Sequence, residues 1–150
     1  MGTFFLRGLG VAKDAQKATA LYQAACDKGS APTCRILGYF YYAGKEVQRD
    51  LKLAAAALDR GCKLGDAMSC AGLGELYEEG QGVPRDLARA LRLFVEACDG
   101  GYAGGCSSLA SMYEQGNGVP ADPTRALALH RQACSGGDED SCRAVTRLAE

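Results

Sequence analysis

The sequence predicts an all-α protein built from repeats of one helical unit. Three observations support this fold class. All eight cysteines fall into four pairs with partners eight residues apart, and each pair follows the last by 36 residues. Apolar residues recur at helical spacing within each unit, and glycine-rich turns separate the helical stretches. A fixed period of this length is typical of repeat architectures, in which stacked units bury a continuous core.

The period of 36 residues runs through the chain without insertion or deletion. It predicts a single repeat domain over residues 1–150, with approximate units at 1–34, 35–70, 71–106 and 107–142. Residues 143–150 are expected to begin a further helix pair or to form a cap. Extending the period backwards places Met1 in the middle of a unit, so we expect the first unit to be cut short and the sequence to begin inside a longer protein.

The first helix of each unit carries an apolar stripe at positions i, i+3, i+4 and i+7, which predicts one buried face. The stripes are Cys34, Leu37, Gly38 and Tyr41; Cys70, Leu73, Gly74 and Tyr77; and Cys106, Leu109, Ala110 and Tyr113. Glycine destabilises a helix interior by about 1 kcal/mol relative to alanine. Its recurrence in the stripe therefore predicts that another helix crosses there at close range.

The first helix is expected to end at a Gly-x-Gly-Val turn, where glycine permits a left-handed C-cap; examples begin at Gly80 and Gly116. This turn ends a helix and follows no strand, so a phosphate-binding loop is not expected. An aspartate in each unit is predicted to cap the second helix: Asp14, Asp50, Asp86 and Asp122. The inward face of the second helices is predicted to contain Ala54, Leu58 and Gly61; Ala90, Phe94 and Ala97; and Ala126, His130 and Ala133.

Each cysteine pair spans the short turn between a second helix and the next first helix. Antiparallel helices joined by so short a turn bring residues eight apart to within the roughly 4.4–6.8 Å between Cα atoms that a disulfide requires. We therefore expect four disulfides, Cys26–Cys34, Cys62–Cys70, Cys98–Cys106 and Cys134–Cys142, the one pairing that treats every unit alike. The alternatives are reduced core cysteines, catalytic thiols and zinc, although zinc sites normally gather four cysteine or histidine ligands.

Composition excludes several function classes. With 17 basic and 18 acidic residues, the chain gives no electrostatic reason to expect nucleic-acid binding. The longest apolar run, residues 53–58, is too short to insert into a membrane. His130 is the only histidine and is expected to fill the core, so no cofactor, metal or catalytic residue is predicted. Disulfides indicate a periplasmic or secreted protein, although the first residues contain no usable secretory signal.

These residues together resemble a known family. Gly-x-Gly-Val-x-x-Asp, an alanine-marked helix and Ala-Cys followed by a second cysteine, at a period of 36 residues, resemble the Sel1-like repeat, a relative of the tetratricopeptide repeat. The cysteine spacing is similar to that of the cysteine-rich secreted subfamily typified by the Helicobacter cysteine-rich proteins. The resemblance covers essentially the whole chain. It implies a right-handed α-solenoid of helix pairs with a disulfide at each hairpin, acting as a non-enzymatic adaptor or scaffold for proteins or peptides.

The resemblance also implies a binding face, because the first helices line the concave side in the related tetratricopeptide architecture. The candidate residues are Arg35, Tyr39, Tyr42, Glu75, Glu78, Glu79, Ser111 and Glu114. This face grades from aromatic to acidic. We expect it to bind an extended peptide or protein segment, with the tyrosines as apolar anchors and Glu75, Glu78 and Glu114 meeting a basic residue. An ordinary solvated face is the alternative.

The competing function is binding or hydrolysis of β-lactams or cell-wall peptides, which has been described for some members of the resembled family. A serine β-lactamase uses Ser-x-x-Lys with Ser-Asp-Asn and Lys-Thr-Gly, and the chain contains none of these motifs. Gly-x-Ser-x-Gly is also absent. Because these catalytic motifs are absent, we expect no enzymatic activity. The lysine and asparagine residues of the carboxylate clamp found in chaperone cochaperones are also missing from the candidate face.

Overall fold

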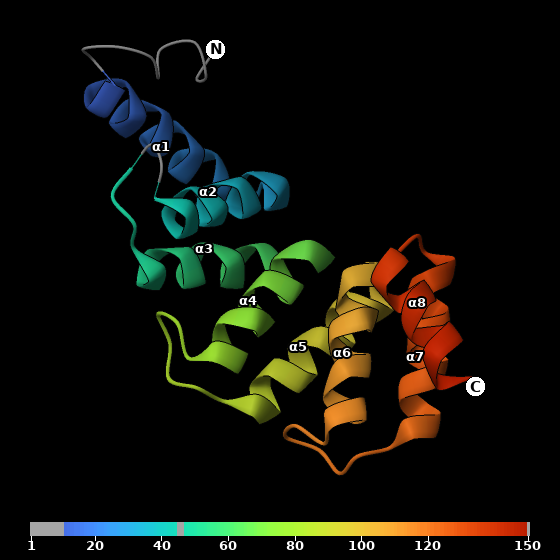
Figure 1. Cartoon of the computed structure of the whole chain (residues 1–150). Coiled ribbons are helices and arrows are strands. Elements are labelled where there is room, and N and C mark those ends of the chain that lie inside the picture. Colours follow the sequence, from blue (N-terminus) through green and yellow to red (C-terminus); the bar gives the residue numbers. More distant parts are fainter. Residues whose placement is uncertain (1–10, 45–46, 150) are drawn as a thin grey trace.

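A computed structural model describes residues 11–44 and 47–149 of the chain. Within these ranges the chain is all-helical, and each helix packs against the next. The helices stack side by side in a curved row (Figure 1). The predicted all-α solenoid is confirmed, whereas the start of the first predicted unit, residues 1–10, lies outside the described residues. The helices are α1 (Val11–Asp27), α2 (Ala31–Ala43), α3 (Leu51–Lys63), α4 (Ala67–Glu79), α5 (Leu87–Asp99), α6 (Ala103–Gln115), α7 (Pro123–Ser135) and α8 (Glu139–Leu148).

The longer connections, which follow α2, α4 and α6, contain the predicted glycine turns. Gly80 and Gly116 terminate α4 and α6 in the left-handed conformation, with φ of 68° and 67°. Gly82 also has a positive φ, and a Cβ atom there would lie 2.3 Å from the carbonyl oxygen of Leu51. Only glycine fits at this position, because both the backbone angle and the close approach of α3 exclude a side chain.

Aspartates cap three of the second helices as predicted. The carboxylates of Asp50, Asp86 and Asp122 accept hydrogen bonds from backbone N–H groups in the first turns of α3, α5 and α7. The same prediction is wrong for Asp14. Helix α1 already begins at Val11 and has 17 residues where α3 has 13, so Asp14 lies inside its first turn, where its charge still favours the helix dipole.

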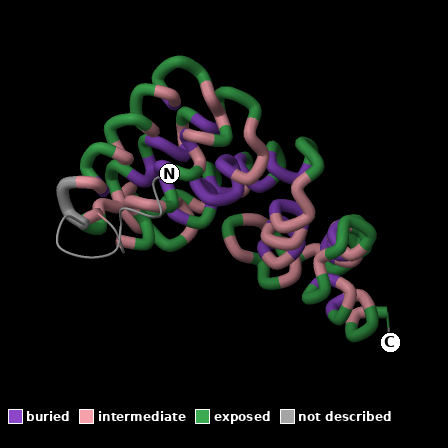
Figure 2. Tube along the Cα trace, turned by 90° about the horizontal axis from the view of Figure 1, so that it is seen from above, coloured by how far each residue is buried: buried purple, intermediate pink, exposed green. Residues whose placement is uncertain are grey.

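The predicted stripes form the core, and buried residues run through the middle of the stack (Figure 2). Each stripe glycine of a first helix lies beneath the large side chain of the following helix. A Cβ atom at Gly38 would lie 2.8 Å from Cδ2 of Leu58, and one at Gly74 would lie 2.7 Å from Cε1 of Phe94. The predicted close helix crossing is therefore confirmed, and the crossing partner is the bulky residue of the second helix.

Four disulfides join the helices across the short turns, as predicted. The pairs are Cys26–Cys34, Cys62–Cys70, Cys98–Cys106 and Cys134–Cys142, with Cα atoms 4.7, 4.6, 4.5 and 4.6 Å apart. Because all eight cysteine sulfur atoms are bonded in pairs, none is left as a free thiol, which contradicts the reduced, catalytic and zinc alternatives. Closing an eight-residue loop stabilises the folded state by about 2.5 kcal/mol in the chain-entropy model. Each bridge thus fastens one helix pair to the next.

Candidate functional site

The eight residues of the predicted binding face lie on three helices, α2, α4 and α6. Helix α4 contacts both α2 and α6, so these three helices adjoin although each is separated from the next by an intervening helix in the sequence. The face nevertheless divides into two parts. Tyr39, Tyr42, Glu75 and Glu79 meet at the joint between α2 and α4, whereas Glu114 belongs to a separate network near α8.

A small hollow lies at the joint between α2 and α4. It has a volume of about 40 Å³ and is lined by Tyr39, Tyr42, Leu58, Gly72, Glu75, Leu76, Glu79 and Gln81. The two tyrosines keep 43% and 40% of their surface exposed, so their rings are accessible walls of the hollow. Gly72 lets α2 approach closely, since a Cβ atom at this position would lie 3.5 Å from the Tyr39 hydroxyl and 3.3 Å from Leu58 Cδ1.

Three glutamates give the end of α4 a negative potential. Desolvation by burial and the neighbouring charges of Glu79 and Glu78 raise the pKa of Glu75 above its usual value, although its side chain still reaches solvent. Desolvation and Glu79 also raise the pKa of Glu78, which Arg85 partly offsets. Within residues 11–44 and 47–149, no ion pair joins Glu75 or Glu79 to a basic side chain.

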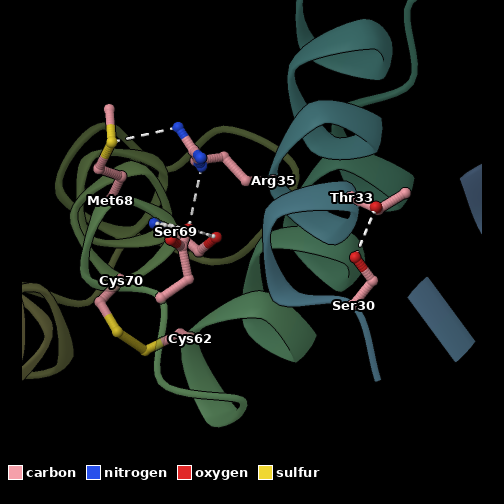
Figure 3. A network of polar contacts seen from close by, with 8 residues as sticks. Ser30, Thr33, Arg35, Cys62, Met68, Ser69 and Cys70 are labelled. Atoms are coloured by element: carbon pink, nitrogen blue, oxygen red, sulfur yellow. Dashed lines mark hydrogen bonds and ion pairs between the residues drawn. A yellow bond between two sulfur atoms is a disulfide. The ribbon is translucent and has the colours of Figure 1, made fainter. Parts of the chain in front are cut away.

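Arg35 lies at the start of the same face but is already engaged (Figure 3). Its Nε atom is 3.1 Å from Oδ2 of Asp66, and its Nη1 group donates to the sulfur of Met68. Asp66 is the N-cap of α4, where its carboxylate accepts hydrogen bonds from the N–H and hydroxyl groups of Ser69. Arg35 therefore links α2 to the first turn of α4 and is not left free to meet a ligand.

Glu114 also has intramolecular partners. Its carboxylate is 2.7 Å from Nη2 of Arg147 and 3.2 Å from Nε2 of His130. The hydrogen bond from Arg147, and a weaker contribution from His130, lower the pKa of Glu114 despite its partial burial. Glu114 was predicted to meet a basic residue of a bound segment, but its carboxylate already pairs with Arg147 and His130 of the same chain. Ser111, one turn earlier on α6, is half-buried.

His130 has two partners that the sequence did not reveal. It is 4% exposed, and its Nδ1 atom lies 3.0 Å from Oγ of Ser141, whose N–H group donates to the Asp138 carboxylate. A serine–histidine–glutamate set has the composition of an acyl-transfer triad, but Ser141 is 0% exposed and cannot reach a substrate. The set instead fastens α8 to α6 and α7. The sequence did contain a signal for the cap of α8 by Asp138, because Asp66 and Ser69 occupy the positions 72 residues before Asp138 and Ser141.

The part of the chain that the structure describes was a candidate for two further features, a metal site and a membrane-spanning helix. Cys62, Cys70 and Glu96 place their ligand atoms within 4.8 Å of one another, but the two sulfurs are bonded in a disulfide and do not coordinate a metal ion. None of the helices is both long enough and apolar enough to span a bilayer.

Three solved structures share this arrangement of helices. A Sel1 repeat protein from Oxalobacter formigenes superposes with a TM-score of 0.81 at 25% identity, covering 89% of this chain and 53% of that one. A protective antigen of uropathogenic Escherichia coli, which displays an SLR fold, gives a TM-score of 0.77 at 29% identity, covering 82% and 26%. Helicobacter pylori cysteine rich protein B gives 0.71 at 28% identity, covering 89% and 96%.

The chain thus spans about half the length of the first of these proteins and about a quarter of the second. No curated protein matches the sequence. The family model described as Sel1 repeat matches four consecutive segments, residues 1–30, 31–66, 67–102 and 103–138. These matches cover most of the sequence and follow the period of the cysteine pairs. The chain belongs to the Sel1 repeat family.

Proposed function

We propose that the chain is a non-enzymatic scaffold that binds an extended protein or peptide segment across α2 and α4. The observation that carries this proposal is the hollow at their joint, where two exposed tyrosines stand opposite two glutamates that have no basic partner among the described residues. Exposed aromatic side chains commonly anchor protein interfaces, and complementary charge orients the partner. A segment with apolar and basic residues matches this surface.

The paired residues of the predicted face have a different role in this proposal. Arg35 and Glu114 hold neighbouring helices together and so fix the spacing of α2, α4 and α6. Tyr39, Tyr42, Glu75 and Glu79 contact the partner, with Glu78 at the edge. The membership in the Sel1 repeat family supports a role in protein interaction. The four disulfides support a location outside the reducing cytosol, and we assign the protein to the periplasm or the secreted fraction.

A peptide-display selection on the purified chain tests the proposal. Peptides enriched in basic and apolar residues should be selected, and the double variant Tyr39→Ala, Glu75→Gln should weaken their binding at least tenfold. Val95→Ala, on the partly exposed surface of α5, should leave binding unchanged. Selected peptides that bind the double variant equally well would contradict the proposal. So would turnover of a chromogenic β-lactam that persists through repurification and disappears in the double variant.

A further inference from the structure

The geometry points to a specificity pocket within this face: the hollow between α2 and α4 receives the side chain of a lysine from the bound segment. This inference rests on the proposed function, because the lysine must be carried by a segment that lies across the two helices. It adds to that function the identity of one anchoring residue and the position at which it enters.

The walls of the hollow suit a side chain that is apolar along its length and charged at its end. Tyr39 and Tyr42 form the α2 side, and buried Leu58 and Leu76 lie at the base, so the methylene groups of a lysine find apolar surface. Glu75 and Glu79 are four residues apart and therefore occupy one face of α4. An ammonium group between these carboxylates and a tyrosine ring gains both charge pairing and a cation–π contact.

The size of the hollow favours lysine over arginine. Its volume is only about 40 Å³. An ammonium group is compact and fits such a space, whereas a guanidinium is a wider planar fork.

The basic residues nearby do not already fill this role. Arg35 is paired with Asp66, and Arg85 donates its Nε–H to the backbone carbonyl of Glu78. Arg49 lies over the Tyr42 ring, with its Cζ atom 5.7 Å from the centroid, so Tyr39 is the ring left for a guest ammonium. Desolvation, together with the neighbouring carboxylates, also raises the pKa of Glu75, and a bound cation would relieve this cost of ionisation.

The next joint along the stack does not repeat this chemistry. At the corresponding positions between α4 and α6, 36 residues later, Glu75 and Glu78 replace the two tyrosines, and Ser111 and Gln115 replace the two glutamates. These four positions provide no aromatic ring and no carboxylate on α6, and the nearby Glu114 of α6 is already paired with Arg147 and His130. A single lysine should therefore set the register of the bound segment along the stack.

Four oriented decapeptide libraries on the full chain test this inference by fluorescence anisotropy. Each library fixes one residue at the centre, lysine, arginine, acetyl-lysine or norleucine, and randomises the rest. The lysine library should bind at least tenfold more tightly than the acetyl-lysine and norleucine libraries, and severalfold more tightly than the arginine library. Tyr39→Leu and Glu75→Gln should each abolish the preference, while Glu139→Gln, an exposed glutamate on α8, should preserve it.

The outcomes separate this inference from the function on which it rests. Equal binding of all four libraries, lost in the double variant Tyr39→Ala, Glu75→Gln, would refute the lysine pocket and leave the peptide-binding scaffold standing. A preference for arginine would also refute the pocket. Failure of every library to bind would overturn the scaffold proposal and the pocket together. Circular dichroism of each variant distinguishes lost recognition from lost folding.

Discussion

Replacing Gly74 with alanine tests whether close contact with α5 is the reason for a glycine in the middle of α4. The added Cβ atom would lie 2.7 Å from Cε1 and 2.9 Å from Cδ1 of Phe94. These separations are about 1 Å shorter than the optimal contact between carbon atoms. Phe94 is 0% exposed, so its ring is enclosed and cannot turn away without disturbing its neighbours.

Two opposing contributions decide the sign of the effect. Alanine is favoured over glycine within a helix by about 1 kcal/mol. Overpacking a rigid core typically costs about 1–3 kcal/mol. We therefore expect Gly74→Ala to lower the free energy of unfolding by about 1 kcal/mol, as the difference of the two contributions.

Gly72, two residues earlier in the same helix, is the matched control. A Cβ atom there would lie 3.5 Å from the Tyr39 hydroxyl, an ordinary contact, and 3.3 Å from Leu58 Cδ1, so the end of the Leu58 side chain must move by only a few tenths of an ångström. The helix preference should dominate in Gly72→Ala and raise stability by about 0.5 kcal/mol. With a urea m-value of about 2 kcal/mol/M, the midpoints of the two variants should differ by roughly 0.7 M.

Circular dichroism during urea unfolding, without reductant so that the disulfides stay formed, measures both midpoints. The double variant Gly74→Ala, Phe94→Leu should restore part of the loss, because leucine vacates the space that the new methyl group needs. Equal stabilisation by Gly72→Ala and Gly74→Ala would refute the packing explanation. So would a double variant whose loss is the plain sum of the two single losses.

Two further predictions concern the last helix. A phosphine should reduce the disulfide Cys134–Cys142 first, because both its cysteines are partly exposed whereas the cysteines of the other bridges are buried. Alkylation and mass mapping after brief reduction measure the order in which the bridges are reduced. A different first bridge would contradict the prediction. Glu114→Gln should lower stability by about 1 kcal/mol at pH 7 through loss of the pairs with Arg147 and His130. The pKa of Glu114 is lowered in the folded state, so the stability that its carboxylate contributes is fully present above the ordinary glutamate pKa. This contribution is lost as the pH falls through the lowered pKa. The free energies of unfolding of the variant and the parent should therefore converge in acid.

The repeat period accounts for what the sequence predicted well. Positions that recur every 36 residues occupy equivalent places in each unit, so the stripes ending at Tyr41, Tyr77 and Tyr113 could be placed on one face of a helix from spacing alone. The disulfide pairing followed from the same periodicity, since the short turn fixes which cysteines meet. Close packing at Gly38 and Gly74 was also readable, because glycine recurs where the helix preference opposes it.

The ion-pair partners of charged side chains could not be predicted from the repeat spacing. Spacing shows that Arg35 and Glu114 lie on the outer face of a first helix, but their partners Asp66 and Arg147 follow 31 and 33 residues later, in the next helix pair and in α8. A long side chain can turn along the surface toward any of several neighbours. Which neighbour it reaches depends on helix crossing geometry that the period does not contain.

The prediction that Asp14 caps a helix was wrong for a related reason. A capping residue must lie where the preceding chain leaves the helical path, and α1 continues beyond that point to Val11. His130 was correctly predicted to fill the core, but its contact with Ser141 depends on a pattern that recurs every second unit. Asp66 with Ser69 and Asp138 with Ser141 share this pattern, whereas Tyr102 at the corresponding position of α6 provides no side-chain cap.

The position of the disulfides determines what a protease can accomplish. A cut in a short turn, for example between Cys98 and Cys106, leaves the two halves in one covalent molecule with the helices still stacked. A cut in a glycine connection such as residues 80–86 lies outside every bridge and leaves two fragments held together only by the packing of α4 against α5. In an environment rich in proteases, four of the seven connections between the helices can therefore be cut without separating the chain covalently, and only the three glycine connections need protection.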